Sequence, residues 1–191
     1  MTMTKHVLSS LLLFSVSANA QLHVSFKISN EISPVLSKVI HDYPNYFNNI
    51  KGDVLENDPQ ITNYTCLLNI KDMEPGIITQ YGREAEHQFS WSNVLLQTED
   101  YNEAKRKFRL FYADIKKTSA LIRNTLVKLN ADYIEPDDSK NFCNILFKVQ
   151  PGVDDINNLI VDLNMQYEMS EWKITLSLYN KEDEKKIYGI E

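Results

Sequence analysis

The sequence has little glycine and cysteine, and beyond its first twenty residues it contains no long apolar run. With 5 Gly, 6 Pro and 2 Cys among 191 residues, it does not have the composition of a collagen-like, disordered or disulfide-dense chain. A surplus of basic residues is also missing, since the formal net charge is −6. The chain therefore has no excess of basic side chains to displace the counterions of nucleic-acid phosphates, and we expect no nucleic-acid partner. A globular chain with one core remains.

Motifs for common enzyme classes are missing too. No His-Glu-x-x-His stretch offers two zinc ligands and a base on one helical face. No Gly-x-Ser-x-Gly turn presents a nucleophile, and the glycines do not cluster into a phosphate-binding loop. The sequence therefore predicts no catalytic residue, no metal site and no cofactor.

The N-terminus has the pattern of a secretory signal peptide. Lys5 precedes an apolar run from Val7 to Val16, and Ala18-Asn19-Ala20 supplies the small residues that a signal peptidase requires. About ten apolar residues are too few to span a hydrocarbon layer of roughly 30 Å, which takes about 20. We predict cleavage after Ala20, a periplasmic or extracellular location and no stable membrane anchor. Residues 21–191 then form a single domain.

The two cysteines stand in similar sequence contexts. Each is followed by a Pro-Gly pair and then by a tryptophan on an alternating segment: Cys66, Pro75-Gly76 and Trp91, then Cys143, Pro151-Gly152 and Trp172. An exported chain can keep a disulfide, so Cys66 and Cys143 are a candidate pair. The alternative is that both are small buried hydrophobic residues.

This duplicated order predicts the architecture. We expect an α+β fold of two pseudo-repeats, about 31–100 and 101–183, each with one helix and three antiparallel strands. The helices should pack on one face of the sheet, because Trp172, Ile174, Leu176 and Leu178 alternate with polar residues that suit a solvated face.

Periodicity and turn residues give the expected elements. A helix capped by Ser33 should run until Pro44, followed by a polar connection through Gly52 and Pro59. A second helical pattern begins at Thr98–Asp100 and continues to Leu129, in one piece or two. Strands are expected at 61–70, 77–81, 88–96, 142–149, 159–166 and 171–179.

One segment is a candidate ligand site. If residues 81–91 are extended, Tyr81, Arg83 and His87 lie on one face, together with Phe89 and Trp91. Arg83 would pair with a carboxylate, and the aromatic rings would stack on a ligand. The alternative is a charged hairpin tip at the rim of the sheet. The basic residues of the second helix, among them Lys105, Arg109 and Lys116, are interpreted as its solvated face.

Two functions follow from this interpretation. The first is an exported, non-catalytic module that binds a protein, or else a small ligand or glycan, through the uncovered face of the sheet or a hairpin rim. The abundant tyrosine favours such binding. The alternative is a small exported hydrolase with a carboxylate or histidine site near the 81–91 hairpin.

Overall fold

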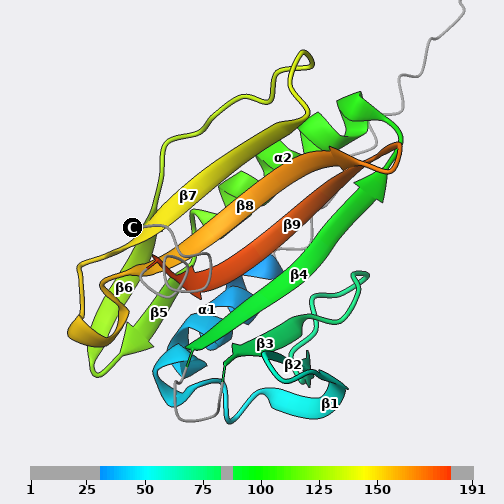
Figure 1. Cartoon of the computed structure of the whole chain (residues 1–191). Coiled ribbons are helices and arrows are strands. Elements are labelled where there is room, and N and C mark those ends of the chain that lie inside the picture. Colours follow the sequence, from blue (N-terminus) through cyan, green and yellow to red (C-terminus); the bar gives the residue numbers. More distant parts are fainter. Residues whose placement is uncertain (1–30, 83–87, 182–191) are drawn as a thin grey trace, which may run out of the picture.

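The computed structural model describes residues 31–82 and 88–181 (Figure 1). Within them, nine strands form one antiparallel sheet in the order β1-β2-β3-β4-β9-β8-β7-β6-β5. The helical elements are α1 (Ile32–Asp42), α2 (Tyr101–Ile115) and the short 3₁₀ turns η1 (Tyr43–Asn45) and η3 (Asp154–Ile156). The strands are β1 (Lys51–Asn57), β2 (Ile61–Cys66), β3 (Ile77–Tyr81), β4 (Gln88–Thr98), β5 (Ser119–Ile122), β6 (Thr125–Asn130), β7 (Phe142–Gln150), β8 (Leu159–Glu168) and β9 (Glu171–Asn180).

Both helices lie on the same face of the sheet, behind it in Figure 1. They bury apolar residues at helical spacing, while the strands bury alternate residues, and all of these side chains join one core cluster. The cluster includes Leu36, Val39 and Ile40 from α1, Phe108, Phe111 and Ile115 from α2, and Trp91, Phe147 and Leu176 from the sheet. No helix among the described residues is long and apolar enough to cross a membrane.

The predicted fold of two units, each with one helix and three strands, is wrong. α1 is followed by four strands and α2 by five, and all nine belong to one sheet. The two tryptophans also differ in their surroundings. Trp91 is fully buried beside Gly76, whereas Trp172 lies between Tyr101 and Tyr167 in tilted ring contacts, with centroids 5.1 Å away in each case.

Two segments account for the additional strands. The helix expected to continue to Leu129 ends at Ile115, and the chain then forms the hairpin of β5 and β6. Its turn residues Arg123 and Asn124 have φ of 45° and 68°, values that suit a two-residue hairpin turn. The expected polar connection contains β1, whose last five residues are exposed, so no alternation of apolar and polar residues revealed it.

Other predicted elements are confirmed. The second helix begins where its cap was predicted, because Asp100 accepts a hydrogen bond from the Asn102 backbone N–H at 2.8 Å. Strands β3, β4, β7, β8 and β9 lie at the predicted positions within a few residues. Ser33 is not the cap of α1 but lies within its first turn, and its N–H donates to Asp114 of α2 at 3.4 Å.

The helix α1 covers the outer edge of β5. Ser37 Oγ donates to the carbonyl oxygen of Ser119, and His41 Nδ1 lies within hydrogen-bond distance of the carbonyl oxygen of Leu121, both at 2.6 Å. The two helix residues are one turn apart, and the two carbonyls are two residues apart on the strand. An edge strand left open would present such groups to other chains.

Candidate functional site

The face of the sheet opposite the helices carries a broad group of small polar side chains. Their neighbours along each strand, such as Trp91, Leu163 and Leu176, are buried in the core, so alternation points these polar groups outward. We call this group the polar band: Asn63, Thr79, Ser90, Ser92, Thr175, Ser177, Asn164 and Asn144, with Asp162 as its charged member.

Strand register aligns the polar band across six strands. Ser92, Ser177 and Asp162 are successive cross-strand partners on β4, β9 and β8. In the same way Thr175, Asn164 and Asn144 follow one another on β9, β8 and β7, and Asn63, Thr79 and Ser90 on β2, β3 and β4. Neighbouring strands are about 4.8 Å apart, so each row presents hydrogen-bonding groups at that spacing.

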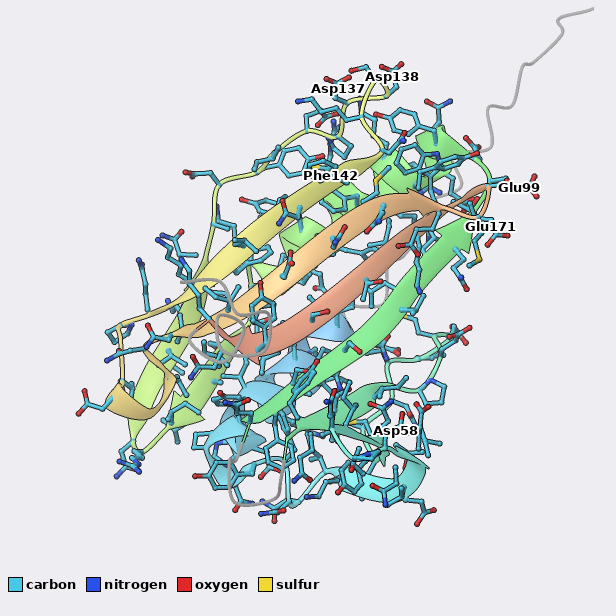
Figure 2. The ribbon with its side chains drawn as sticks, in the orientation of Figure 1. Asp58, Glu99, Asp137, Asp138, Phe142 and Glu171 are labelled. Carbon is cyan, nitrogen blue, oxygen red and sulfur yellow. The ribbon has the colours of Figure 1, made fainter. Side chains whose placement is uncertain are left out.

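The polar band has apolar and acidic surroundings. On β7, Phe142 and Leu146 flank Asn144 on the same face, with 63% and 45% of their surface exposed. Figure 2 shows Asp137 and Asp138 near Phe142, at one end of the molecule. Glu99 and Glu171 lie near that end as well, because the register Thr98↔Trp172 brings the end of β4 next to the start of β9. A partner on this face would meet half-buried hydroxyls and amides, two exposed apolar side chains and an acidic margin.

The predicted ligand platform is described only in part. Tyr81 ends β3 and its hydroxyl lies 3.2 Å from Ser90 Oγ, so it adjoins the polar band. Arg83 and His87 lie outside the described residues. The expected sharing of one face fails for Phe89 and Trp91, because the registers Gln80↔Phe89 and Ile78↔Trp91 put both on the core side while Tyr81 is on the other. The hydrolase alternative also includes residues outside the described ranges.

A small open hollow lies elsewhere, between the loop at Asp72–Glu74 and strand β4 at Val94–Gln97. Its volume is about 210 Å³, and Asn93 Nδ2 donates to the Glu74 carbonyl oxygen at 2.9 Å beside it. β3 pairs with β4 only as far as Ser92, which leaves this space next to the sheet. In the described ranges, no three His, Cys, Asp or Glu side chains gather as metal ligands would.

The two cysteines do not form the candidate disulfide in this structure. Cys66 lies on β2 and Cys143 on β7, with four strands between them, and both are free and buried. Five strand steps correspond to about 24 Å, far beyond the Cα separation of about 4.4–6.8 Å that a bridge requires. Burial raises the pKa of both thiols. The fold therefore fits the alternative of two buried thiols.

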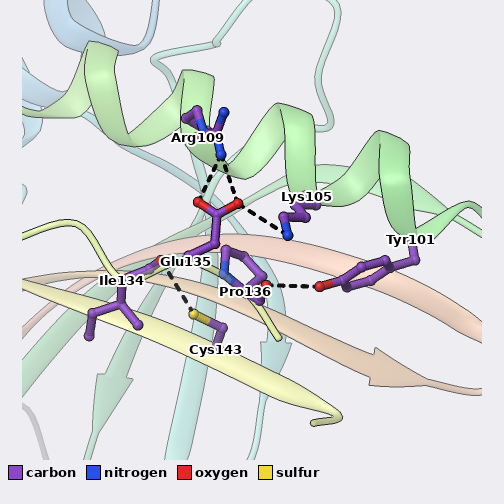
Figure 3. A network of polar contacts seen from close by, with 7 residues as sticks. All are labelled: Tyr101, Lys105, Arg109, Ile134, Glu135, Pro136 and Cys143. Carbon is purple, nitrogen blue, oxygen red and sulfur yellow. Dashed lines mark hydrogen bonds and ion pairs between the residues drawn. The ribbon is translucent and has the colours of Figure 1, made fainter. Parts of the chain in front are cut away.

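A further polar cluster was not predicted. Residues 131–141, which we call the strap, join β6 to β7 and run along α2 (Figure 3). Arg109 Nη2 donates to both carboxylate oxygens of Glu135, at 2.7 and 2.8 Å, and Lys105 Nζ lies 3.1 Å from one of them. The hydrogen bonds from Arg109 and then from Lys105 lower the pKa of the Glu135 carboxyl to about 2.

The strap is also held through its backbone. Tyr101 OH donates to the Pro136 carbonyl oxygen and Tyr112 OH to that of Ala131, both at 2.9 Å, and Lys116 Nζ donates to Ala131 as well, at 3.2 Å. Four residues on one face of α2 and its C-cap Lys116 make these contacts, and we call them the α2 ladder: Tyr101, Lys105, Arg109, Tyr112 and Lys116. Their spacing of four, four, three and four residues was readable in the sequence, but their partner was not. Lys105, Arg109 and Lys116 lie at the surface as interpreted, and they also contact the strap, which was not predicted.

Comparison with known proteins adds no family to this description: no protein-family model, no curated protein and no solved structure matches the chain.

Proposed function

We propose that the mature chain is an exported, non-catalytic module that binds a protein partner through the polar band. The observation that supports this most strongly is the alignment of hydroxyl and amide side chains across six neighbouring strands on the face without helices. Such groups donate and accept hydrogen bonds and do not exchange protons near neutral pH.

The surroundings of the polar band favour a protein over a small molecule. Small ligands prefer concave sites that bury most of their surface, whereas protein interfaces are broad and combine polar groups with a few apolar anchors. Phe142 and Leu146 are exposed beside Asn144 and would serve as such anchors. The acidic margin at Asp137 and Glu171 would favour a partner with a basic rim, and association would then slow as salt rises.

The test begins with the cleaved chain, residues 21–191, used to isolate and identify a partner from the envelope or secreted fraction of its source. The affinity of that purified partner is then measured for the wild-type chain and for Ser177→Arg and Asn144→Arg, which place a long cation in the polar band. Asn102→Arg is the matched control, because Asn102 is exposed on α2 at the other face.

We expect both variants in the polar band to weaken binding by about tenfold or more, as the loss of contacts at an interface centre does, while Asn102→Arg binds as the wild type does. Equal affinity of all four proteins would contradict the proposal. Retention of a glycan or small molecule instead of a protein would contradict it as well.

A further inference from the structure

The strap lies along α2 as an extended segment of opposite direction. Tyr112 donates a hydrogen bond to Ala131 of the strap. Tyr101 lies eleven residues before Tyr112 on the helix and donates to Pro136, which lies five residues after Ala131 on the strap. Eleven helical residues rise about 16 Å. Five extended residues cover about the same length. The spacing of the α2 ladder therefore matches an extended chain, and a helical or compact segment would not satisfy both tyrosines.

Apart from Tyr133, whose ring centroid lies 5.0 Å from that of Tyr112 and 5.9 Å from the Arg109 guanidinium carbon, the α2 ladder recognises little of the strap's sequence. Both tyrosine hydroxyls and Lys116 donate to backbone carbonyl oxygens, which every residue carries. The specific polar contact is the acid at Glu135, which takes Arg109 and Lys105 together. The site thus selects an extended segment in which an acidic residue, here Glu135, directly precedes the residue whose carbonyl oxygen accepts the hydrogen bond from Tyr101.

These contacts lie at the surface. The side chains of Lys105, Arg109 and Glu135 are 35%, 61% and 42% exposed, so the ion pairs can exchange at the surface. Pro136 is buried and Tyr133 packs against the core, so displacement of the strap also uncovers these two side chains. The strap also lies next to a part of β7 that lacks a strand partner on that side, because β6 pairs with β7 only through Lys148–Gln150. An extended segment seated there has a sheet edge beside it as well as a helix.

We propose that the α2 ladder is a binding site for an extended acidic segment of a protein partner, and that the strap occupies it in cis. The charge of the site fits this occupant, since three of its five residues are cations in a chain of net charge −6. A tethered strap competes at an effective concentration of about millimolar, so a segment in trans binds weakly until the strap is loosened. The inference does not rest on the polar band, which lies on the other face and shares with it only the strap residues Asp137 and Asp138 of the acidic margin.

The experiment uses Glu135→Gln to loosen the strap within the full mature chain. The probe is a fluorescent peptide with the sequence of residues 131–141, and its binding is followed by anisotropy. Asp138→Asn is the matched control, because Asp138 is an exposed acid of the same strap with no contact to Lys105 or Arg109 in the structure. A second peptide carries Gln at the position of Glu135.

We expect the Glu135→Gln protein to bind the acidic peptide about fivefold more tightly than the wild-type and Asp138→Asn proteins do. The Gln peptide, or addition of Arg109→Gln to the protein, should remove that gain. Equal binding by all proteins would overturn the proposal, and so would a Glu135→Gln chain that fails to fold, since the strap would then be a fixed part of the core. Sedimentation of Glu135→Gln as a dimer without peptide would assign the site to a second copy and overturn the assignment to a partner.

Discussion

His41 of α1 is hydrogen-bonded through its imidazole Nδ1 to the backbone carbonyl oxygen of Leu121, 2.6 Å away, at the outer edge of β5. Together, the side chains of His41 and Ser37 occupy backbone carbonyl groups of β5 with which a further strand would otherwise pair.

Replacing His41 by alanine should lower the free energy of unfolding by about 1 kcal/mol, because one hydrogen bond to the edge of the sheet is lost. Urea unfolding measures this change. The double variant with Ser37→Ala should also self-associate as its concentration rises, which sedimentation velocity detects. Lys38→Ala, at an exposed position of the same helix, is the control and should stay within about 0.5 kcal/mol of the wild type. Equal stability of His41→Ala and Lys38→Ala would contradict the role of this contact.

The strap should respond to acid through Glu135. Its pKa in the folded chain is about 2, below the ordinary value of 4.5. A lowered pKa means that the carboxylate stabilises the folded strap fully above about pH 4.5, and that this contribution is lost as the pH falls towards 2. The carboxyl carbon shift of Glu135, followed by NMR, should titrate with a midpoint near 2.

Arg109→Gln provides the control for this titration. Removal of the strongest hydrogen-bond donor should move the midpoint of Glu135 up towards its ordinary value. A midpoint near 4.5 in the wild-type chain would show that the ion pair does not persist in solution.

Glycine at position 76 should be required for the packing of Trp91. A Cβ atom built there would lie 2.7 Å from Trp91 Nε1 and 3.3 Å from the Ser92 carbonyl oxygen. Trp91 is fully buried and has no room to move. Gly76→Ala should therefore destabilise the fold by about 1–3 kcal/mol, as overpacking of a core does, and should alter the tryptophan fluorescence.

Gly152→Ala is the matched comparison for Gly76→Ala. The nearest atom to a Cβ at Gly152 belongs to the side chain of Asn157, whose amide can rotate away. The cost should be clearly smaller than at Gly76. Equal destabilisation by the two substitutions would contradict this account of Trp91.

The predicted export can be tested on the chain as its source produces it. The small residues at Ala18 and Ala20 predict that the mature N-terminus is Gln21, which N-terminal sequencing reads directly. Ala20→Arg should block cleavage and leave the full-length mass, because the pocket of a signal peptidase is narrow. A wild-type chain that keeps its first twenty residues would contradict the predicted leader.

Sequence patterns predicted those elements whose core-facing residues are regularly spaced. Trp172, Ile174, Leu176 and Leu178 alternate, and they lie on β9 as expected. Leu121, Ile122, Leu126 and Leu129 also fitted a helix, yet Leu121 and Leu126 are cross-strand partners that point outward. The turn at Arg123-Asn124 was the available signal against a helix.

The candidate sites depended on information that one sequence does not contain. Alternation predicted a solvated side for β9, but the alignment of Ser92 with Ser177 depends on strand register, which pairing fixes. Likewise, the cations of α2 were recognisable, while Glu135 became their partner only through the path of the strap.

The central position of β9 determines when the sheet can close. β9 pairs with β4 on one side and β8 on the other, so it joins the two halves of the sheet although it is the last of the described strands in sequence order. A polypeptide that emerges N-terminus first therefore contains two separate parts of the sheet until residues 171–180 have emerged and can pair with both. Loss of that one segment would divide the sheet through its middle, whereas loss of β1 would shorten it only at one edge.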